Sequence, residues 1–120
     1  MRILLVEDDE LFLKLVSTLV SANAGPVDAV LTGLEGLALL RTNEYDVLIT
    51  DLLMEGLNGV DLIRLALTEQ LIDSHHILAL TAEQEDSPHL YWVRRHGIRV
   101  LHKPFTAPQF ADALRAISSA

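Results

Sequence analysis

The sequence predicts an α/β fold in which a five-stranded parallel sheet carries five helices on its two faces. Short apolar runs alternate with longer amphipathic stretches, and most of the runs are apolar without interruption. Uninterrupted apolar strands indicate burial on both faces of the sheet. The alternation covers almost all 120 residues with no linker or low-complexity tract, so we expect a single domain spanning residues 1–120.

Five stretches have the composition of strands, at residues 3–6, 27–32, 47–50, 77–80 and 98–101. The first, third and fourth are the most uniformly apolar, which indicates that they are buried on both faces. The stretch 27–32 contains Asp28 and is less uniform, which favours a position nearer an edge.

Helical patterns fill the intervals, at about residues 10–22, 34–41, 59–71 and 83–96 and from Thr106 onward. In the first pattern, Leu11, Leu15 and Leu19 recur every four residues, which predicts that they form one apolar face. The last helix opens with Thr106 as its cap and Gln109 in position to close a capping box.

The composition excludes several classes of protein. There is no cysteine, which excludes disulfides and thiolate metal sites. The net charge of −8 without a basic stripe argues against direct binding to nucleic acid or to an anionic membrane surface. We see neither a signal sequence nor an apolar run approaching the ~20 residues of a membrane-spanning helix. We therefore expect a cytoplasmic protein.

Polar residues follow four of the five predicted strands. Because the carboxyl ends of parallel strands meet at one edge of the sheet, these side chains should converge on a site there. They are Glu7, Asp8 and Asp9 after the first strand, Asp51 after the third, Thr81 after the fourth and Lys103 after the fifth.

The residue types at this edge favour phosphoryl chemistry. Grouped carboxylates repel one another unless a cation lies among them, and oxygen ligands without thiolate favour Mg²⁺. The Asp51 carboxylate can attack phosphorus and form an acyl phosphate. The Lys103 ammonium, the Thr81 hydroxyl and the cation would then stabilise the phosphoryl oxygens. The five histidines share no spacing typical of a metal site.

Four stretches also resemble the response-regulator receiver family, and the resemblance extends over the full length of the chain. The distances in sequence between the matching residues also fit the family pattern. There are 43 residues from Asp8 to Asp51, 30 from Asp51 to Thr81 and 22 from Thr81 to Lys103. The resemblance implies a flavodoxin-like open sheet with strand order 2-1-3-4-5. The matching stretches are Ile3-Leu4-Leu5-Val6-Glu7-Asp8-Asp9, Thr50-Asp51-Leu52-Leu53-Met54, Leu80-Thr81-Ala82 and Lys103-Pro104-Phe105.

The resemblance implies a role for each matching residue. Asp51 would be the phosphoacceptor and, with Asp8 and the main-chain carbonyl of Leu53, a ligand of Mg²⁺. Glu7 would assist the metal, through water. Thr81 and Lys103 would contact the phosphoryl group, and the Lys103–Pro104 bond would be cis. Asp9 is assigned to capping the first helix. Because three acids are adjacent, the sequence leaves open which of them bind the metal.

The function that the resemblance implies is that of a phosphoacceptor switch rather than an enzyme. A histidine kinase or phosphotransfer protein would donate the phosphoryl group. An effector domain or partner would then bind the surface of the fourth helix, fifth strand and fifth helix. Tyr91 and Trp92 lie in that fourth helix, where each belongs either to the core or to an interface.

Two positions depart from the family pattern. Glu55 stands where the family usually has proline, which adds a negative charge near the acidic residues and should alter metal affinity or loop order. Val100 stands where an aromatic side chain often reports activation, so the output mechanism is open.

Two other functions compete with this interpretation. A degenerate receiver would act as a binding module without phosphorylation. An aspartate-dependent phosphatase would usually carry a second aspartate two residues after the nucleophile, where this chain has Leu53.

Overall fold

The computed structural model describes residues 1–119 and contains one parallel sheet. The strand order is β2-β1-β3-β4-β5, so the predicted fold class and strand order are confirmed. The less apolar strand β2 lies at one edge, as predicted, and β5 lies at the other. The strands are β1 (Ile3–Val6), β2 (Val27–Val30), β3 (Val47–Asp51), β4 (Ile77–Thr81) and β5 (Arg99–His102).

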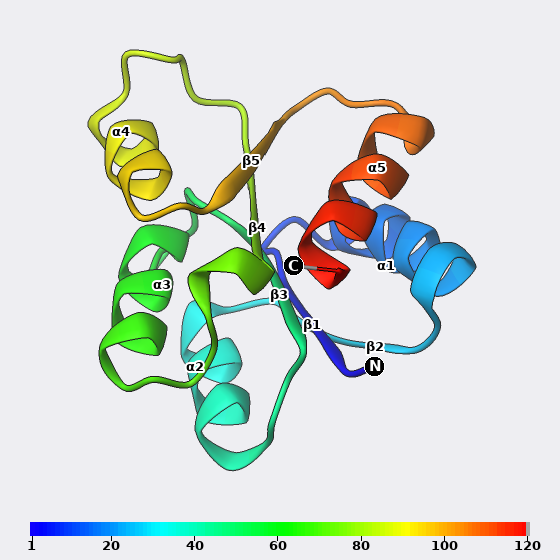
Figure 1. Cartoon of the computed structure of the whole chain (residues 1–120), viewed down its shortest axis with the longest axis horizontal. Helices are drawn as coiled ribbons and strands as arrows, with labels where there is room; N and C mark the ends of the chain where they lie inside the picture. The colour runs from blue at the N-terminus through cyan, green and yellow to red at the C-terminus, as the bar shows by residue number, and fades with distance from the viewer. Residues whose placement is uncertain (120) are drawn as a thin grey trace.

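Five α-helices connect and cover the strands within the described residues. Figure 1 shows α1 and α5 on one side of the sheet and α2, α3 and α4 on the other. None of the described helices is long and apolar enough to cross a membrane. The helices are α1 (Glu10–Ala24), α2 (Gly33–Thr42), α3 (Gly59–Thr68), α4 (Pro88–Arg95) and α5 (Ala107–Ser118), with a 3-10 turn η1 (Ser74–His76) before β4.

Two hydrophobic cores lie on opposite faces of the sheet. Side chains alternate along each strand, so Leu4 and Val6 of β1 join the core under α2, α3 and α4. Ile3 and Leu5 join the core under α1 and α5. All four side chains are buried, which explains why the apolar run of β1 is continuous.

The predicted apolar face of α1 was wrong for two of its three residues. Leu11 is 79% exposed and Leu15 is 53% exposed, whereas Leu19 is partly buried against the core. Val16 and Val20 are the fully buried residues of this helix. Apolar residues surround much of the α1 circumference, so more than one face satisfies a four-residue spacing. Packing against the sheet and α5 decides between these faces.

The fourth helix starts later than predicted, at Pro88 rather than near residue 83. The residue before a proline disfavours helical backbone, and the Ser87 hydroxyl accepts the N–H of His89 as a cap. Residues 82–87 therefore form a loop after β4. The third helix ends at Thr68 instead of 71, because Gln70 adopts a positive φ of 57°.

Other local predictions are confirmed. Asp9 caps α1 by accepting the N–H groups of Leu11 and Phe12 at 3.0 and 3.2 Å. Thr106 and Gln109 form the expected capping box at the start of α5. The Lys103–Pro104 peptide bond is cis.

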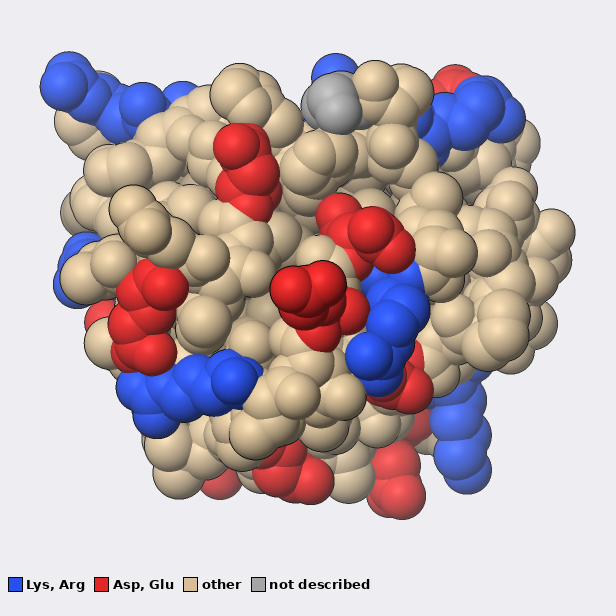
Figure 2. Space-filling view, turned by 60° about the horizontal axis from the view of Figure 1, so that its bottom comes forward, with Lys and Arg blue, Asp and Glu red and all other residues tan. Residues whose placement is uncertain are grey.

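The face in Figure 2 shows acidic and basic side chains lying beside one another rather than in a basic stripe. Exposed ion pairs include Arg2 with Asp28 at 3.4 Å and Arg41 with Glu69 at 2.6 Å. Exposed pairs of this kind add little to stability.

Candidate functional site

Four of the polar residues predicted to converge, Glu7, Asp8, Asp51 and Lys103, meet at the carboxyl edge of the sheet. Carboxylate oxygens of Glu7, Asp8 and Asp51 all lie within 4.8 Å of one another. The Lys103 ammonium lies 3.0 Å from a Glu7 oxygen and 3.3 Å from an Asp51 oxygen. Three segments that are distant in the sequence therefore supply one compact, charged cluster. We call its three carboxylates, Glu7, Asp8 and Asp51, the acidic pocket.

Two of the three carboxylates are buried. Glu7 is fully buried and Asp51 is 8% exposed, whereas Asp8 is exposed. Burial raises the pKa of both buried carboxyls above the usual value for an acid. Hydrogen bonds from Lys103 and from main-chain N–H groups offset only part of this rise in pKa. With Lys103 as its neighbour, each of the two carboxyls therefore still has a raised pKa.

The acidic pocket fits a hard divalent cation. Its donors are carboxylate oxygens that lie close together, which is the ligand type that Mg²⁺ prefers. Added positive charge would also favour the ionised forms of the buried acids. Asp9 is not one of these three residues, since its carboxylate is occupied in capping α1.

Thr81 closes β4 beside the pocket and is almost fully buried. Its hydroxyl oxygen accepts the N–H of Glu83 at 3.0 Å. The Glu83 carboxylate in turn accepts the Ser87 hydroxyl at 2.9 Å and contacts a His89 ring nitrogen at 2.8 Å. The Thr81 hydroxyl is therefore tied to the start of α4, a link that the sequence did not reveal.

The loop between β3 and α3 borders the acidic pocket. Leu53 is half exposed in this loop. The N–H of Glu55 donates to an Asp8 carboxylate oxygen at 3.4 Å. Glu55 thus lies next to Asp8, one of the candidate ligands.

Gly59 fixes the position of this loop. A Cβ atom added at Gly59 would lie 1.8 Å from the Asp51 carbonyl oxygen and 2.8 Å from Leu52 Cα. The Gly59 N–H donates to the Leu52 carbonyl at 2.9 Å. No side chain fits at this contact, so α3 begins directly against the end of the strand that carries Asp51.

The sequence reasoning also missed Phe12. The Lys103 ammonium lies 4.2 Å from the centre of the Phe12 ring. One phenylalanine in a largely apolar helix gives no signal in the sequence, because nothing in the pattern shows that the ring faces a lysine 91 residues away.

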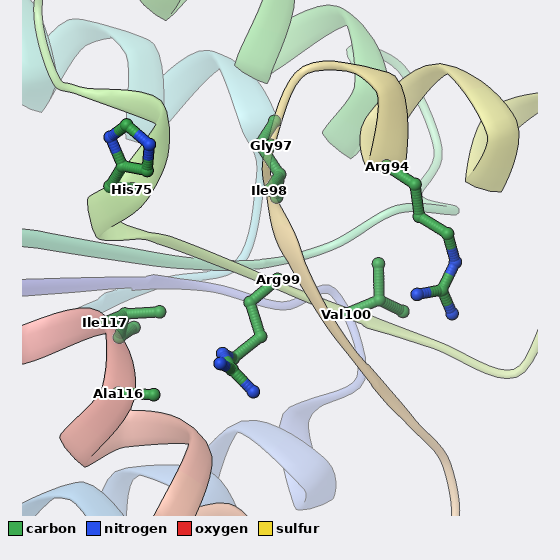
Figure 3. Close-up of a pocket in the computed structure, with 8 residues that line it drawn as sticks. All are labelled: His75, Arg94, Gly97, Ile98, Arg99, Val100, Ala116 and Ile117. Atoms are coloured by element: carbon green, nitrogen blue, oxygen red, sulfur yellow. The ribbon is translucent and has the colours of Figure 1, made fainter. Parts of the chain in front are cut away.

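The surface around β5 is formed by Val100, His102 and two arginines rather than by a cluster of acids. Val100 packs against the core under α2, α3 and α4. A His102 ring nitrogen lies 3.2 Å from the Glu85 carboxylate, close enough for an ion pair but without the alignment of a hydrogen bond. A hollow of about 440 Å³ at the start of β5 is lined in part by Arg94 and Arg99 (Figure 3).

Comparisons with known proteins agree with this geometry. The family model described as the response regulator receiver domain matches residues 3–115. The phosphate regulon transcriptional regulatory protein PhoB of Rhizobium meliloti is 28% identical over 116 residues, which cover 97% of this chain and 51% of that protein. The chain thus spans about half the length of this relative. The chemotaxis protein CheY of Pseudomonas aeruginosa is 26% identical over 121 residues, which cover 98% of this chain and 95% of CheY.

A similar solved structure is the receiver domain of the Francisella response regulator 1452. It superposes with a TM-score of 0.84 at 23% identity and covers 98% of this chain and 96% of that one. At this identity the likeness concerns the fold.

Proposed function

Because the chain belongs to the family of response regulator receiver domains, we propose that it accepts a phosphoryl group on Asp51 from a histidine kinase or phosphotransfer protein. A receiver is a phosphoacceptor switch rather than a classical enzyme. The observation that carries the proposal is the acidic pocket, in which the buried Asp51 carboxylate lies 3.3 Å from the Lys103 ammonium.

In the proposed reaction Asp51 is the nucleophile. One of its carboxylate oxygens bonds to phosphorus while the bond from phosphorus to the donor histidine nitrogen breaks, and the electron pair stays on the imidazole. Lys103 pairs with a phosphoryl oxygen, and the Thr81 hydroxyl, whose oxygen accepts the Glu83 N–H, donates its own hydrogen to another. Glu7, Asp8, Asp51 and the Leu53 carbonyl are the proposed Mg²⁺ ligands. When bound, Mg²⁺ supplies positive charge that balances the phosphoryl oxygens.

We expect the protein to gain the mass of one phosphoryl group when it is incubated with a small phosphodonor and Mg²⁺. Asp51→Asn should abolish the gain, because the amide is not a nucleophile toward phosphorus, and chelation of Mg²⁺ should also abolish it. Intact-mass spectrometry measures both effects. A folded wild-type protein that gains no mass would favour the phosphorylation-independent binding module. Continuous release of inorganic phosphate without a stable adduct would favour a phosphatase.

Glu55 should strengthen Mg²⁺ binding through its negative charge. We expect Glu55→Gln, which keeps the N–H that reaches Asp8, to weaken Mg²⁺ binding about two- to fivefold at low ionic strength. The difference should shrink in 1 M salt, because exposed charges are screened. Isothermal titration measures the affinity, and Glu44→Gln, in the link before β3, is the matched control. Superimposable titrations of wild type, Glu55→Gln and Glu55→Pro would remove any role of Glu55.

We further propose that α4, β5 and α5 form the partner surface. Tyr91 is 65% exposed on α4, whereas Trp92 packs against the core. The hollow beside β5 adds Arg94 and Arg99 to this surface (Figure 3). An effector domain or a separate protein would bind here.

A further inference from the structure

Three aromatic rings form a continuous cluster beside Lys103. The Phe12 and Phe105 rings meet edge to face with their centres 5.8 Å apart. Phe105 stacks on Phe110 at 5.7 Å, and Phe110 is fully buried in the core under α1 and α5. The Phe12 ring is thus supported from the core outward, and it presents a face to the Lys103 ammonium at 4.2 Å.

The ammonium therefore has three neighbours in a defined arrangement. Oxygens of Glu7 and Asp51 attract it at 3.0 and 3.3 Å, and the centre of the Phe12 ring lies 4.2 Å away. A lysine side chain has four rotatable bonds, so ordering it costs conformational entropy. The side chain of Lys103 is still 22% exposed, which leaves it a path toward solvent. An aromatic face attracts a cation and reduces this freedom without competing for its hydrogen bonds.

We propose that Phe12 is a positioning residue for phosphorylation, whose ring holds the Lys103 ammonium beside Asp51 before and after the phosphoryl group arrives. The inference rests on the proposed function of Asp51. A carboxylate placed at this position would also attract the lysine, but it would add charge to a pocket that already holds three acids. A ring attracts the ammonium and leaves the charge of the pocket unchanged.

The first test compares variants with and without a ring. Phe12→Leu and Phe12→Met keep an apolar side chain but lose the ring face, whereas Phe12→Tyr keeps it. At saturating Mg²⁺ and with a small phosphodonor, we expect the two ring-free variants to be phosphorylated about three- to tenfold more slowly than wild type. Phe12→Tyr should stay within about twofold of wild type, since tyrosine also binds cations through its face.

Tyr45→Leu is the matched control. Tyr45 carries the guanidinium of Arg2 over its ring at 5.0 Å, so this variant removes an interaction of the same kind just before β3. Its phosphorylation rate should equal that of wild type. Thermal unfolding of each variant, measured in parallel, shows whether the protein is folded at the assay temperature.

A second readout does not depend on phosphorylation. The Phe12 ring current should shift the proton resonances of the Lys103 ε-methylene upfield in the unphosphorylated protein. This shift should vanish in Phe12→Leu and persist in Phe12→Tyr. If wild type shows the upfield shift but is never phosphorylated, the proposed function fails while the contact stands. An absent shift in wild type, or a wild-type rate in both ring-free variants, would overturn the role of Phe12.

Discussion

Gly59→Ala is expected to destabilise the protein by about 3 kcal/mol, near the upper end of the range for overpacking. The added methyl group would lie 1.8 Å from the Asp51 carbonyl oxygen, with main-chain atoms as its neighbours. Main chain cannot rotate away as a flexible side chain can, so either the end of β3 or the start of α3 must move. Urea denaturation followed by circular dichroism gives the free energy of unfolding.

Gly25→Ala separates this clash from the general cost of replacing a glycine. Gly25 has a φ of 99° and open space around its Cβ position, so the substitution introduces only backbone strain. We expect it to cost about 1 kcal/mol. If Gly59→Ala costs no more than Gly25→Ala, the close approach of α3 to β3 is wrong.

Asp51→Asn is expected to stabilise the Mg²⁺-free protein by about 1–2 kcal/mol at neutral pH, because it removes a charge whose burial is poorly compensated. Burial raises the pKa of Asp51, and Lys103 offsets only part of the effect. In the pH range between the ordinary pKa and the raised one, the folded protein therefore retains a proton that the unfolded chain releases. The stability of the wild type should fall as the pH rises from about 4 through the raised pKa, whereas Asp51→Asn should show a weaker dependence.

Mg²⁺ should reverse the order of the two proteins. A ligand at one hundred times its dissociation constant stabilises the folded state by about 2.7 kcal/mol, and wild type binds the ion with one more carboxylate. Unfolding in urea with a chelator, and again with saturating Mg²⁺, measures both effects. Asp86→Asn, at an exposed position in the loop before α4, should change stability by less than about 0.5 kcal/mol. A less stable Asp51→Asn in chelator would show that Lys103 fully compensates the buried charge.

The sequence was sufficient for the sheet and its functional edge. The continuous apolar run of β1 indicates a strand whose two faces are both covered. The acids that follow it belong to neither hydrophobic core. The same pattern was insufficient for α1, where Leu15 and Val16 are both apolar and only the position of α5 and the sheet decides which is buried. The start of α4 was predicted too early, although the Ser87-Pro88 pair carries a local signal for it.

Within the site, the residues at the strand ends were predictable and their neighbours were not. Glu7, Asp8 and Asp51 follow strands whose order the fold class determines. The contact of Phe12 with Lys103 depends instead on how α1 lies relative to the end of β5. The link from Thr81 through Glu83 to the start of α4 similarly needs the path of a loop. Such contacts join segments whose relative placement no periodicity encodes.

The division of the interior into two cores has a consequence for how substitutions combine. Neighbouring residues of one strand, such as Leu48 and Ile49 of β3, belong to different cores with the sheet between them. Pairs of substitutions on opposite faces should have nearly additive energies, whereas pairs within one core should couple through shared neighbours. The helices on each face can thus change in sequence with little adjustment on the other, while Asp51, at the end of β3, stays at the edge that both halves share.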